Sequence, residues 1–535
     1  MSSLLQEYSS EIEMSLARIE TLWCSEPGSE TYGCMDREFW AYRTTRGFSS
    51  APFQHVLSGL AHLSEMSEVG EAAKFRTMAM SMVDFWIKNR NKNGSSNEWF
   101  KNEQSFCATA MGLHAVGEAL YLMKDSVPED DFMVRCRQLQ SSAHWLGLRD
   151  NELAANQRIA SCTSRYVLGV LLHDQNICGE ARDSLLDVQS DFSSHGYLSE
   201  YGGIDIGYSL LSLDLLVAAH RAGLSESEQL ANDVCRQLIM VMSGSGYLPF
   251  ELGSRSTFHK FFGGVSYFGR FLETARSVAS TAADARTREQ ADSLSNYDDR
   301  YFSTFAFSAF MRRLFVQQSQ RVSEPLRSPR QDHLPPPPIV SRPCPPGRLF
   351  EHRKFGHALS YVLENERKFT HLGYFFEDSR GHRWTSLTEQ QLSREGYQFT
   401  HVSDSAPLVK FEFLVRLVFS ACRLPFVASF VSQWARTRAG RPRDTIPMVM
   451  HRSIAWLNGK LVVEDRFKIR GTLEGRLSIA DHFPYHSPSH MKMVLANLDA
   501  SKFVRNVKSR DGESEIVIRW CVWSTPQLAI RVDVE

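Results

Sequence analysis

Two segments of this 535-residue chain combine glycine, aromatic and charged residues in a way that core packing does not require. The first, HGYLSEYGGIDIGYS, covers residues 195–209, and the second, GYLPFELGSRSTFHKFFGG, covers residues 246–264. Both adjoin stretches of helical periodicity, so their polar side chains are expected at helix ends beside flexible glycines. Binding groups are commonly carried by such loops on a rigid scaffold. The pattern favours a sugar-binding cleft.

The same segments hold two carboxylates that could hydrolyse a glycosidic bond. Glu200 and Glu251 would supply the acid and the base or nucleophile, and their separation cannot be read from the sequence. Structural roles remain open for their neighbours. Asp205 precedes an apolar helix and suits an N-cap, while Arg255 and His259 could pair with Glu251.

Residues 1–320 are expected to form one helical domain. Apolar residues recur at helical spacing throughout, and no strand-like alternation interrupts them. The predicted helices cover about 10–23, 53–66, 71–89, 103–124, 129–146, 152–173, 205–222, 226–243 and 300–318. Many consecutive helices with short connections fit a layered helical barrel, with the small-residue run at 107–120 as an inner helix.

The pattern changes after a proline-rich linker at 321–349, whose composition is incompatible with helix and favours extended or polyproline II structure. Residues 350–535 alternate with period two and contain an Asn458-Gly459 turn, which predicts an antiparallel β-sandwich. The predicted fold is therefore multidomain α and β.

An apolar segment at 408–443 interrupts the second half and ends in a cluster of arginines. A helical hairpin packed on the sandwich is one interpretation. A basic amphipathic segment lying on an acidic membrane surface is a second, and a transmembrane span is a third.

Composition narrows the class of protein. The chain has 60 basic and 61 acidic residues, which gives no support to a nucleic-acid-binding protein. The ten cysteines form no CxxC pair, and we expect them to be reduced. The first residues are not those of a signal peptide. These features predict a cytoplasmic location, either free or peripheral on the inner face of a membrane.

The chain resembles the heparinase II/III-like polysaccharide lyases, and within them the heparinase-like proteins of bacterial surface-polysaccharide gene clusters. The segments that carry the resemblance are NEWFKNEQSFCATA (97–110), ANQRIA (155–160), YLSEYGGIDIGYSLLSLDLL (197–216), GYLPFELGSRST (246–257) and YFFEDSRGHRW (374–384). The resemblance implies an N-terminal (α/α) toroid, a C-terminal antiparallel β-sandwich, a cleft between them and uronate-containing glycans as substrates.

The resemblance also implies roles for individual residues. Its lyases use a tyrosine, often with a histidine, for β-elimination, and Tyr208 stands at the corresponding place. Arg255 or His259 would be its electrostatic partner, because a nearby cation lowers the pKa of a phenol. The expected substrate-binding residues are Glu103, Asn156, Gln157, Glu200, Tyr201, Asp205 and Glu251. A core tyrosine and structural amides are the alternatives for Tyr208, Asn156 and Gln157.

The sequence identifies no cofactor and no metal ligands, and leaves a divalent metal as an open question. His482, His486 and His490 are spaced by four, but Pro484 and Pro488 prevent their presentation on one helix. The predicted function is a lyase that cleaves an acidic surface polysaccharide or its lipid-linked precursor. A hydrolase or transferase acting on the same glycans, and a non-catalytic glycan-binding or assembly protein at the membrane, are the alternatives. The oligomeric state is not predicted.

Overall fold

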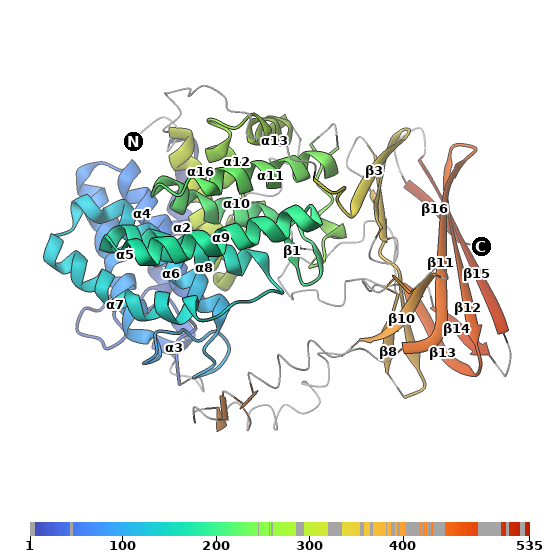
Figure 1. Ribbon diagram of the computed structural model, residues 1–535, viewed down its shortest axis with the longest axis horizontal. Helices are drawn as coiled ribbons and strands as arrows, with labels where there is room; N and C mark the ends of the chain where they lie inside the picture. The colour runs from blue at the N-terminus through green and yellow to red at the C-terminus, as the bar shows by residue number, and fades with distance from the viewer. Residues whose placement is uncertain are drawn as a thin grey trace.

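The computed structural model describes residues 6–42, 47–243, 246–255, 257, 260–284, 294–318, 334–353, 358–363, 368–380, 382–386, 391–392, 396–402, 418, 421–422, 424, 427–428, 430–431, 445–479, 504–509, 513–524 and 530–534. Helices fill the first part of the chain and strands the second, and the two parts lie at opposite ends of the long axis (Figure 1). The chain therefore combines a helical region with antiparallel sheets.

The helices of the first part differ widely in length. They are α2 (Ser9–Leu22), α3 (Arg37–Trp40), η1 (Ala51–His55), α4 (Val56–Met66), α5 (Val69–Asn89), α6 (Phe106–Met123), η2 (Lys124–Ser126), α7 (Glu129–Gly147), α8 (Ala155–Leu172), α9 (Gln175–His195), α10 (Ile206–Arg221), α11 (Glu226–Val241), η3 (Phe250–Leu252), α12 (Gly263–Phe268), α13 (Glu273–Asp284), η4 (Leu294–Asn296), α15 (Asp299–Tyr301), η5 (Phe302–Ala306) and α16 (Phe307–Gln318).

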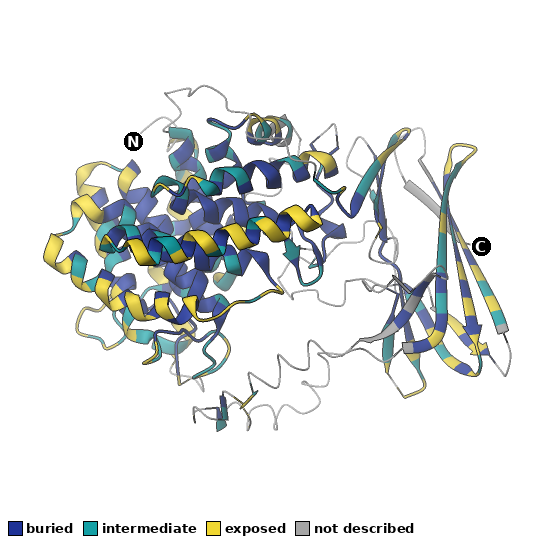
Figure 2. Ribbon diagram, in the orientation of Figure 1, coloured by how far each residue is buried: buried dark blue, intermediate teal, exposed yellow. Residues whose placement is uncertain are grey.

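Six of these helices pack in a closed ring. Helix α4 contacts α6, α6 contacts α8, α8 contacts α10, α10 contacts α12, α12 contacts α16, and α16 returns to α4. Helices α5, α7, α9, α11 and α13 pack against ring helices from outside. Figure 2 shows the difference in burial, with ring helices dark and the outer helices exposed along one side. Two neighbouring helices of the ring have their N-terminal ends side by side only if they run in the same direction.

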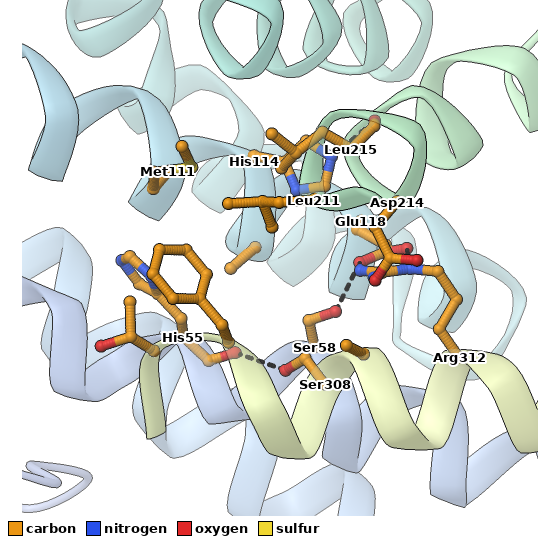
Figure 3. Close-up of a pocket in the computed structure, with 14 residues that line it drawn as sticks. His55, Ser58, Met111, His114, Glu118, Leu211, Asp214, Leu215, Ser308 and Arg312 are labelled. Carbon is orange, nitrogen blue, oxygen red and sulfur yellow. Dashed lines mark hydrogen bonds and ion pairs between the residues drawn. The ribbon is translucent and has the colours of Figure 1, made fainter. Parts of the chain in front are cut away.

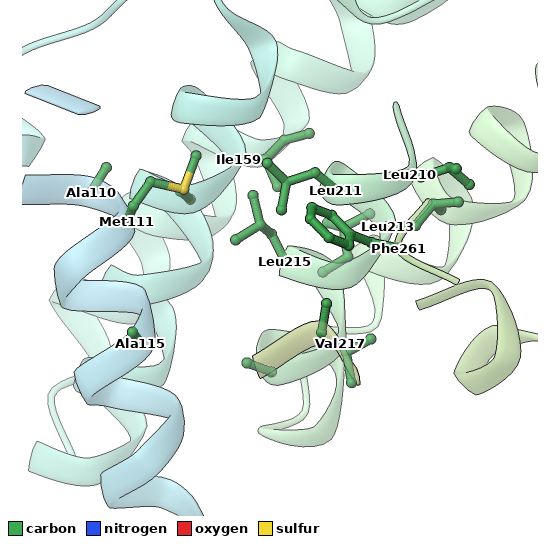
Figure 4. Close-up of a cluster of buried hydrophobic side chains, with 14 of the residues drawn as sticks. Ala110, Met111, Ala115, Ile159, Leu210, Leu211, Leu213, Leu215, Val217 and Phe261 are labelled. Carbon is green, nitrogen blue, oxygen red and sulfur yellow. The ribbon is translucent and has the colours of Figure 1, made fainter. Parts of the chain in front are cut away.

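The composition of each helix explains its layer. In α6 only Cys107 and Tyr121 are partly exposed, and its alanines and glycines allow close packing. A Cβ atom on Gly112 would lie 2.4 Å from Trp86 Nε1, so only glycine fits there. Met111 of this helix extends toward the leucines of α10 in the core (Figure 4).

Helix α9, over 175–195, is absent from the predicted set. Its buried residues form a narrow stripe of Cys178, Ala181, Leu185, Val188 and Phe192, and most of its other residues are polar. Such a narrow stripe gives a weak periodic signal, because an outer helix needs to bury only one edge. Asp174 accepts hydrogen bonds from the Asn176 and Ile177 N–H groups and caps its start.

Helices α6 and α10 run in the same direction. Near their C-terminal ends, the Tyr121 hydroxyl donates to the Arg221 carbonyl at 2.9 Å. Midway along, His114 Nε2 hydrogen-bonds to the Leu215 carbonyl at 2.9 Å. At the other end, Ala154 before α8 forms an isolated β-bridge with Glu200, shortly before α10. The N-terminal ends of α8 and α10 therefore lie together.

The strands begin with a short hairpin between α9 and α10 and resume after α16. They are β1 (Ser199–Glu200), β2 (Gly203–Ile204), β3 (Ile339–Cys344), β4 (Gly347–His352), β5 (Ala358–Leu363), β6 (Lys368–His371), β7 (Tyr374–Asp378), β8 (Arg383–Thr385), β9 (Gln391–Leu392), β10 (Gly396–Val402), β11 (Thr445–Leu457), β12 (Lys460–Arg470), β13 (Leu473–Ile479), β14 (Val504–Ser509), β15 (Glu513–Ser524) and β16 (Ile530–Val534). Strands β3–β4–β5–β6 form a four-stranded sheet, and a ten-stranded sheet has the order β14–β13–β7–β8–β10–β11–β12–β15–β16, with β9 paired to β10.

The four-stranded sheet lies between the helices and the larger sheet. All six residues of β5 are buried. Leu359, Tyr361 and Leu363 share an apolar core with the ten-stranded sheet, whereas Ala358 and Val362 belong to the helical core. Because successive side chains of a strand point to opposite faces, β5 joins both cores.

The segment predicted as a linker, 321–349, already contains structure in its second half. Strand β3 begins at Ile339, and Gly347 begins β4. Prolines are tolerated because β3 is an edge strand of its sheet, where Pro343 needs no N–H for a second neighbour.

Among the described helices, one is long and apolar enough to cross a bilayer. It covers Phe106–Ser126, and 89% of its most apolar window is buried inside the protein.

Candidate functional site

Asp205 brings the two polar segments together. Its carboxylate accepts hydrogen bonds from the Tyr208 N–H at 3.0 Å, where it caps α10, and from the Arg255 and Thr257 N–H groups at 3.0 and 3.2 Å. A Cβ atom on Gly207 would lie 2.3 Å from the Thr257 carbonyl oxygen, so glycine permits this approach. Burial raises the pKa of Asp205 to about 6, although the three N–H groups act to lower it. The N-cap expected as an alternative is present, and it also fixes the Arg255 loop.

The guanidinium of Arg255 is the centre of the cluster. Its Cζ atom lies 4.2 Å from the centroid of the Tyr201 ring. Burial acts to lower the pKa of Arg255, but the adjacent Tyr208, Tyr201 and Asp205 outweigh it and the pKa is raised. Its Nε atom is buried and makes no hydrogen bond within the described part of the chain. One donor of this charged group thus has no acceptor among the described residues.

Glu200 lies fully buried beside this guanidinium. Its Oε1 accepts the Asn156 N–H at 2.7 Å, which caps α8, because the residue at the N-cap position is Ala154 and has no acceptor. Its Oε2 has no hydrogen-bond partner among the described residues. Burial raises the pKa of Glu200 well above its ordinary value, and hydrogen bonds from Asn156 oppose this only in part. Burial therefore favours the protonated form of Glu200, which can donate a proton.

Tyr208 sits in the first turn of α10, partly buried. Burial raises the pKa of its phenol well above the usual value, and Arg255 acts in the opposite direction. The phenol is therefore neutral at pH 7 and is a proton donor as it stands. Acting as a base would require a further cation or acceptor to be brought close, because the phenolate is poorly solvated here.

Two predicted residues, Glu251 and Gln157, have other surroundings. Glu251 is 1% exposed, accepts the hydroxyls of Tyr247 and Ser360 at 2.6 Å each and pairs with Lys368 at 3.3 Å. Burial acts to raise its pKa, but Lys368 and the hydroxyls lower it, so it ties the helices to β5 and β6 as a charged group. Gln157 accepts from Asn151 Nδ2 at 2.8 Å. His259 lies outside the described residues.

Glu103 shapes the loop before α6. Its Oε2 accepts the N–H groups of Glu98 and Trp99, each at 2.7 Å. Burial raises the pKa of Glu103 to about 7, with a smaller contribution in the same direction from Glu98. Burial likewise raises the pKa of Cys107, with contributions from Glu98, Glu103 and Glu200. This loop therefore borders the Glu200 cluster.

A second charged cluster, which the sequence analysis does not identify, lies in the middle of the ring. Arg312 of α16 binds both carboxylate oxygens of Glu118 on α6 at 2.9 and 2.6 Å and Asp214 on α10 at 2.6 Å. Ser58 of α4 donates to Glu118 at 2.5 Å (Figure 3). The available signal was a single acid inside each of two apolar helical runs, GLHAVGEAL and LLSLDLLVAAH. Four ring helices are held by this cluster.

A cavity of about 30 Å³ adjoins the cluster. The charged residues, His55, His114 and Ser308 line it together with apolar side chains such as Met111 and Leu211 (Figure 3). Burial lowers the pKa of His55 to about 3, and the Thr304 backbone accepts a hydrogen bond from its ring. Its Nε2 atom has no partner within the described part. A cavity of this size accommodates a water molecule.

The described residues contain no candidate metal site and only a small part of the insertion at 408–443. Within the described ranges, no group of three or more His, Cys, Asp or Glu side chains could hold a metal ion. His482, His486 and His490 lie outside those ranges, as does most of 408–443. In that insertion Cys422 is buried and its carbonyl accepts Asn102 Nδ2 at 3.3 Å, while Leu424 and Phe430 are exposed.

Comparisons with known proteins give little. No protein-family profile matches the chain, and no curated protein matches it. Among solved structures the chain is similar to a Paenibacillus xanthan lyase, with a TM-score of 0.45 and 10% identity over 89% of this chain and 47% of that one. The chain thus spans about half the length of that lyase. A similarity at this level carries no argument about reaction or substrate.

Proposed function

We propose that this protein cleaves an acidic glycan by β-elimination at the Tyr208–Arg255–Glu200 cluster. The observation that carries the proposal is the Arg255 guanidinium, whose buried Nε atom has no acceptor in the described part of the chain and whose charge acts to lower the pKa of Tyr208. A uronate carboxylate would satisfy that donor and have its charge neutralised, which stabilises the enolate formed when the C5 proton leaves. The positive ends of α8 and α10 favour the same charge.

Proton transfers follow from the protonation states. Elimination breaks the C5–H and C4–O bonds and forms a C4–C5 double bond, and the proton finally resides on the departing oxygen. Tyr208 would act as base in its phenolate form, after its own proton has passed to solvent, and Arg255 is the neighbour that favours this form against the effect of burial. The phenolate takes the C5 proton, and the resulting phenol then donates that proton to the departing C4 oxygen, which restores the phenolate. We propose that the ring of helices is an (α/α) toroid and that the two sheets form a β-sandwich, as in heparinase II/III-like lyases.

Hydrolysis remains a second candidate because burial favours the protonated form of Glu200 beside the cluster. A general acid with a raised pKa is what glycoside hydrolysis requires. Glu251 does not suit the second carboxylate, since its pKa is lowered and Tyr247, Ser360 and Lys368 engage it. A hydrolase would have to use another acid.

The test is ultraviolet absorbance of an unsaturated uronate, measured with purified protein and a panel of acidic polysaccharides. Tyr208→Phe is expected to lower the rate by at least about 100-fold. Tyr166→Phe, a partly buried tyrosine on the outer side of α8, is the matched control and should keep the native rate. Cleavage without the chromophore would indicate hydrolysis. No change in product mass on any polysaccharide would favour a non-catalytic glycan-binding or assembly role.

We further propose that the protein acts in the cytoplasm on a surface polysaccharide or its lipid-linked precursor, with the insertion at 408–443 contacting an anionic membrane. Val418, Leu424 and Phe430 are exposed apolar residues there, and arginines follow in the sequence. Co-sedimentation with vesicles of anionic phospholipid, and its loss in Phe430→Ser, would support this contact. Equal co-sedimentation of the variant, or none of the native protein, would refute it.

A further inference from the structure

An exposed tryptophan stands on the loop between α5 and α6. Trp99 is 59% exposed, although an indole of this size usually buries most of its surface. Large apolar side chains that stay in water on a well-ordered loop are candidates for contact with a ligand.

Two contacts hold Trp99 in place. Its backbone N–H donates to the Glu103 carboxylate at 2.7 Å, and the same oxygen accepts the N–H of Glu98. The Arg300 guanidinium lies over the indole, with Cζ 4.0 Å from the ring centroid, and binds Glu98 Oε1 at 2.6 Å. One face of the ring is therefore covered by a paired cation, and the exposed surface belongs to the remainder of the ring. Little side-chain freedom is left to lose when a ligand binds.

The chemistry of this surface fits the apolar face of a pyranose. The C–H groups on that face carry partial positive charge and approach the negative face of an aromatic ring, while the hydroxyls project sideways to polar groups. Arg300 neutralises Glu98, and Glu103 adds only partial negative charge because its pKa is raised to about 7. Nothing in these contacts attracts a uronate, so a neutral sugar unit suits the surface better than an acidic one.

The loop adjoins the cluster at Tyr208. It precedes α6, which runs in the same direction as α10, and the start of α10 lies beside the start of α8. The loop that carries Trp99 and the cluster at Arg255 therefore lie at the same end of the ring, where one extended glycan can contact both.

We propose that Trp99 is the stacking platform of a separate subsite that takes a neutral pyranose unit of the glycan. The platform rests on the proposed function for its role in a reaction, but its binding can be measured without any reaction. The ligand is thus a heteropolysaccharide that contains both uronate and neutral sugars.

Affinity electrophoresis in gels cast with neutral polysaccharides tests the platform. The probes are a soluble β-glucan, a galactomannan and an arabinogalactan, each against the native protein, Trp99→Ala and Trp99→Phe. Trp99→Ala is expected to raise the Kd obtained from gel retardation by at least about tenfold, and Trp99→Phe is expected to raise it less. Tyr42→Ala is the matched control, because Tyr42 is 62% exposed and lies 5.8 Å from the Arg37 guanidinium. It should leave retardation unchanged.

The outcomes separate the platform from the reaction. Retardation that depends on Trp99 while acidic polysaccharides stay uncleaved supports the platform and refutes the lyase. An active lyase whose KM and neutral-gel retardation are unchanged by Trp99→Ala refutes the platform alone. Retardation absent from all three native gels, or lost equally in Tyr42→Ala, refutes it as well.

Discussion

Replacing Arg312 with methionine should destabilise the helical ring more than the replacement of almost any other charged residue. Arg312 is 5% exposed, and its two partners Glu118 and Asp214 are 2% and 1% exposed. Removing a partner from a buried ion pair leaves an uncompensated charge and costs about 3–5 kcal/mol. Three hydrogen bonds are lost from this cluster. We therefore expect the free energy of unfolding to fall by an amount near the upper end of that range. The midpoint of thermal unfolding should fall by about 10 °C.

The loss should depend on pH in a defined direction. Burial already raises the pKa of Asp214 to about 6, and removal of Arg312 raises it further, along with that of Glu118. A carboxyl whose folded pKa is raised contributes stability below its unfolded pKa, and that stability is lost as the pH rises through the folded value. Arg312→Met should therefore be more destabilising at pH 8 than at pH 5.

Urea denaturation followed by circular dichroism at both pH values measures these effects. Arg135→Met is the matched control, since Arg135 binds Asp84 with two hydrogen bonds of 2.7 and 2.9 Å at the surface. Arg135→Met should lower the free energy of unfolding by less than about 1 kcal/mol. Glu118→Gln added to Arg312→Met should restore part of the stability. A cost for Arg312→Met within that of the control, or a larger cost at pH 5, would refute the assignment of a buried ionic cluster.

Three further outcomes are expected from urea denaturation. Gly112→Ala should cost about 1–3 kcal/mol because its Cβ would lie 2.4 Å from Trp86 Nε1, whereas Gly117→Ala on the same helix, with nearest contact at 3.6 Å, should stabilise by up to about 1 kcal/mol; equal effects would contradict the packing. The unfolded state binds a proton at His55 between pH 6.5 and about 3 while the folded state does not, so stability falls as pH falls through this window, and His55→Asn should reduce that slope by up to about 1.4 kcal/mol per pH unit. An unchanged slope would refute the buried neutral ring. Glu200→Ala should lose about 1–2 kcal/mol with the cap of α8, and Glu200→Gln should lose much less because its amide oxygen can still accept the Asn156 N–H; equal losses would refute the capping role of the Glu200 oxygen.

Particular residues show which parts of the site the sequence could predict. The pairing of Asp205 with an apolar helix predicted an N-cap, and the structure adds that the same carboxylate holds the Arg255 loop. Tyr208, Arg255, Glu200 and Asp205 were all expected at a site, and they share one cluster. Whether that cluster catalyses a reaction stays a prediction.

Other residues depended on contacts that the sequence does not contain. Glu251 pairs with Lys368 and accepts a hydrogen bond from Ser360, and both residues lie more than 100 positions later in the chain. These contacts could not be predicted from the segment around Glu251. The Glu118–Arg312–Asp214 cluster depends on three helices meeting, so only its isolated charges in apolar runs were visible. Helix α9 was missed because its apolar stripe is narrow.

By itself, the sequence determined the succession of helices and then strands, because periodicity and turn residues act over a few neighbouring positions. It also determined the chemical groups near each helix start. The tertiary structure alone decided which of these groups share a site, which became anchors between layers, and which are neutral. Those outcomes depend on burial and on partners far away in the chain, and both exist only after the ring of helices has closed through α16 and α4.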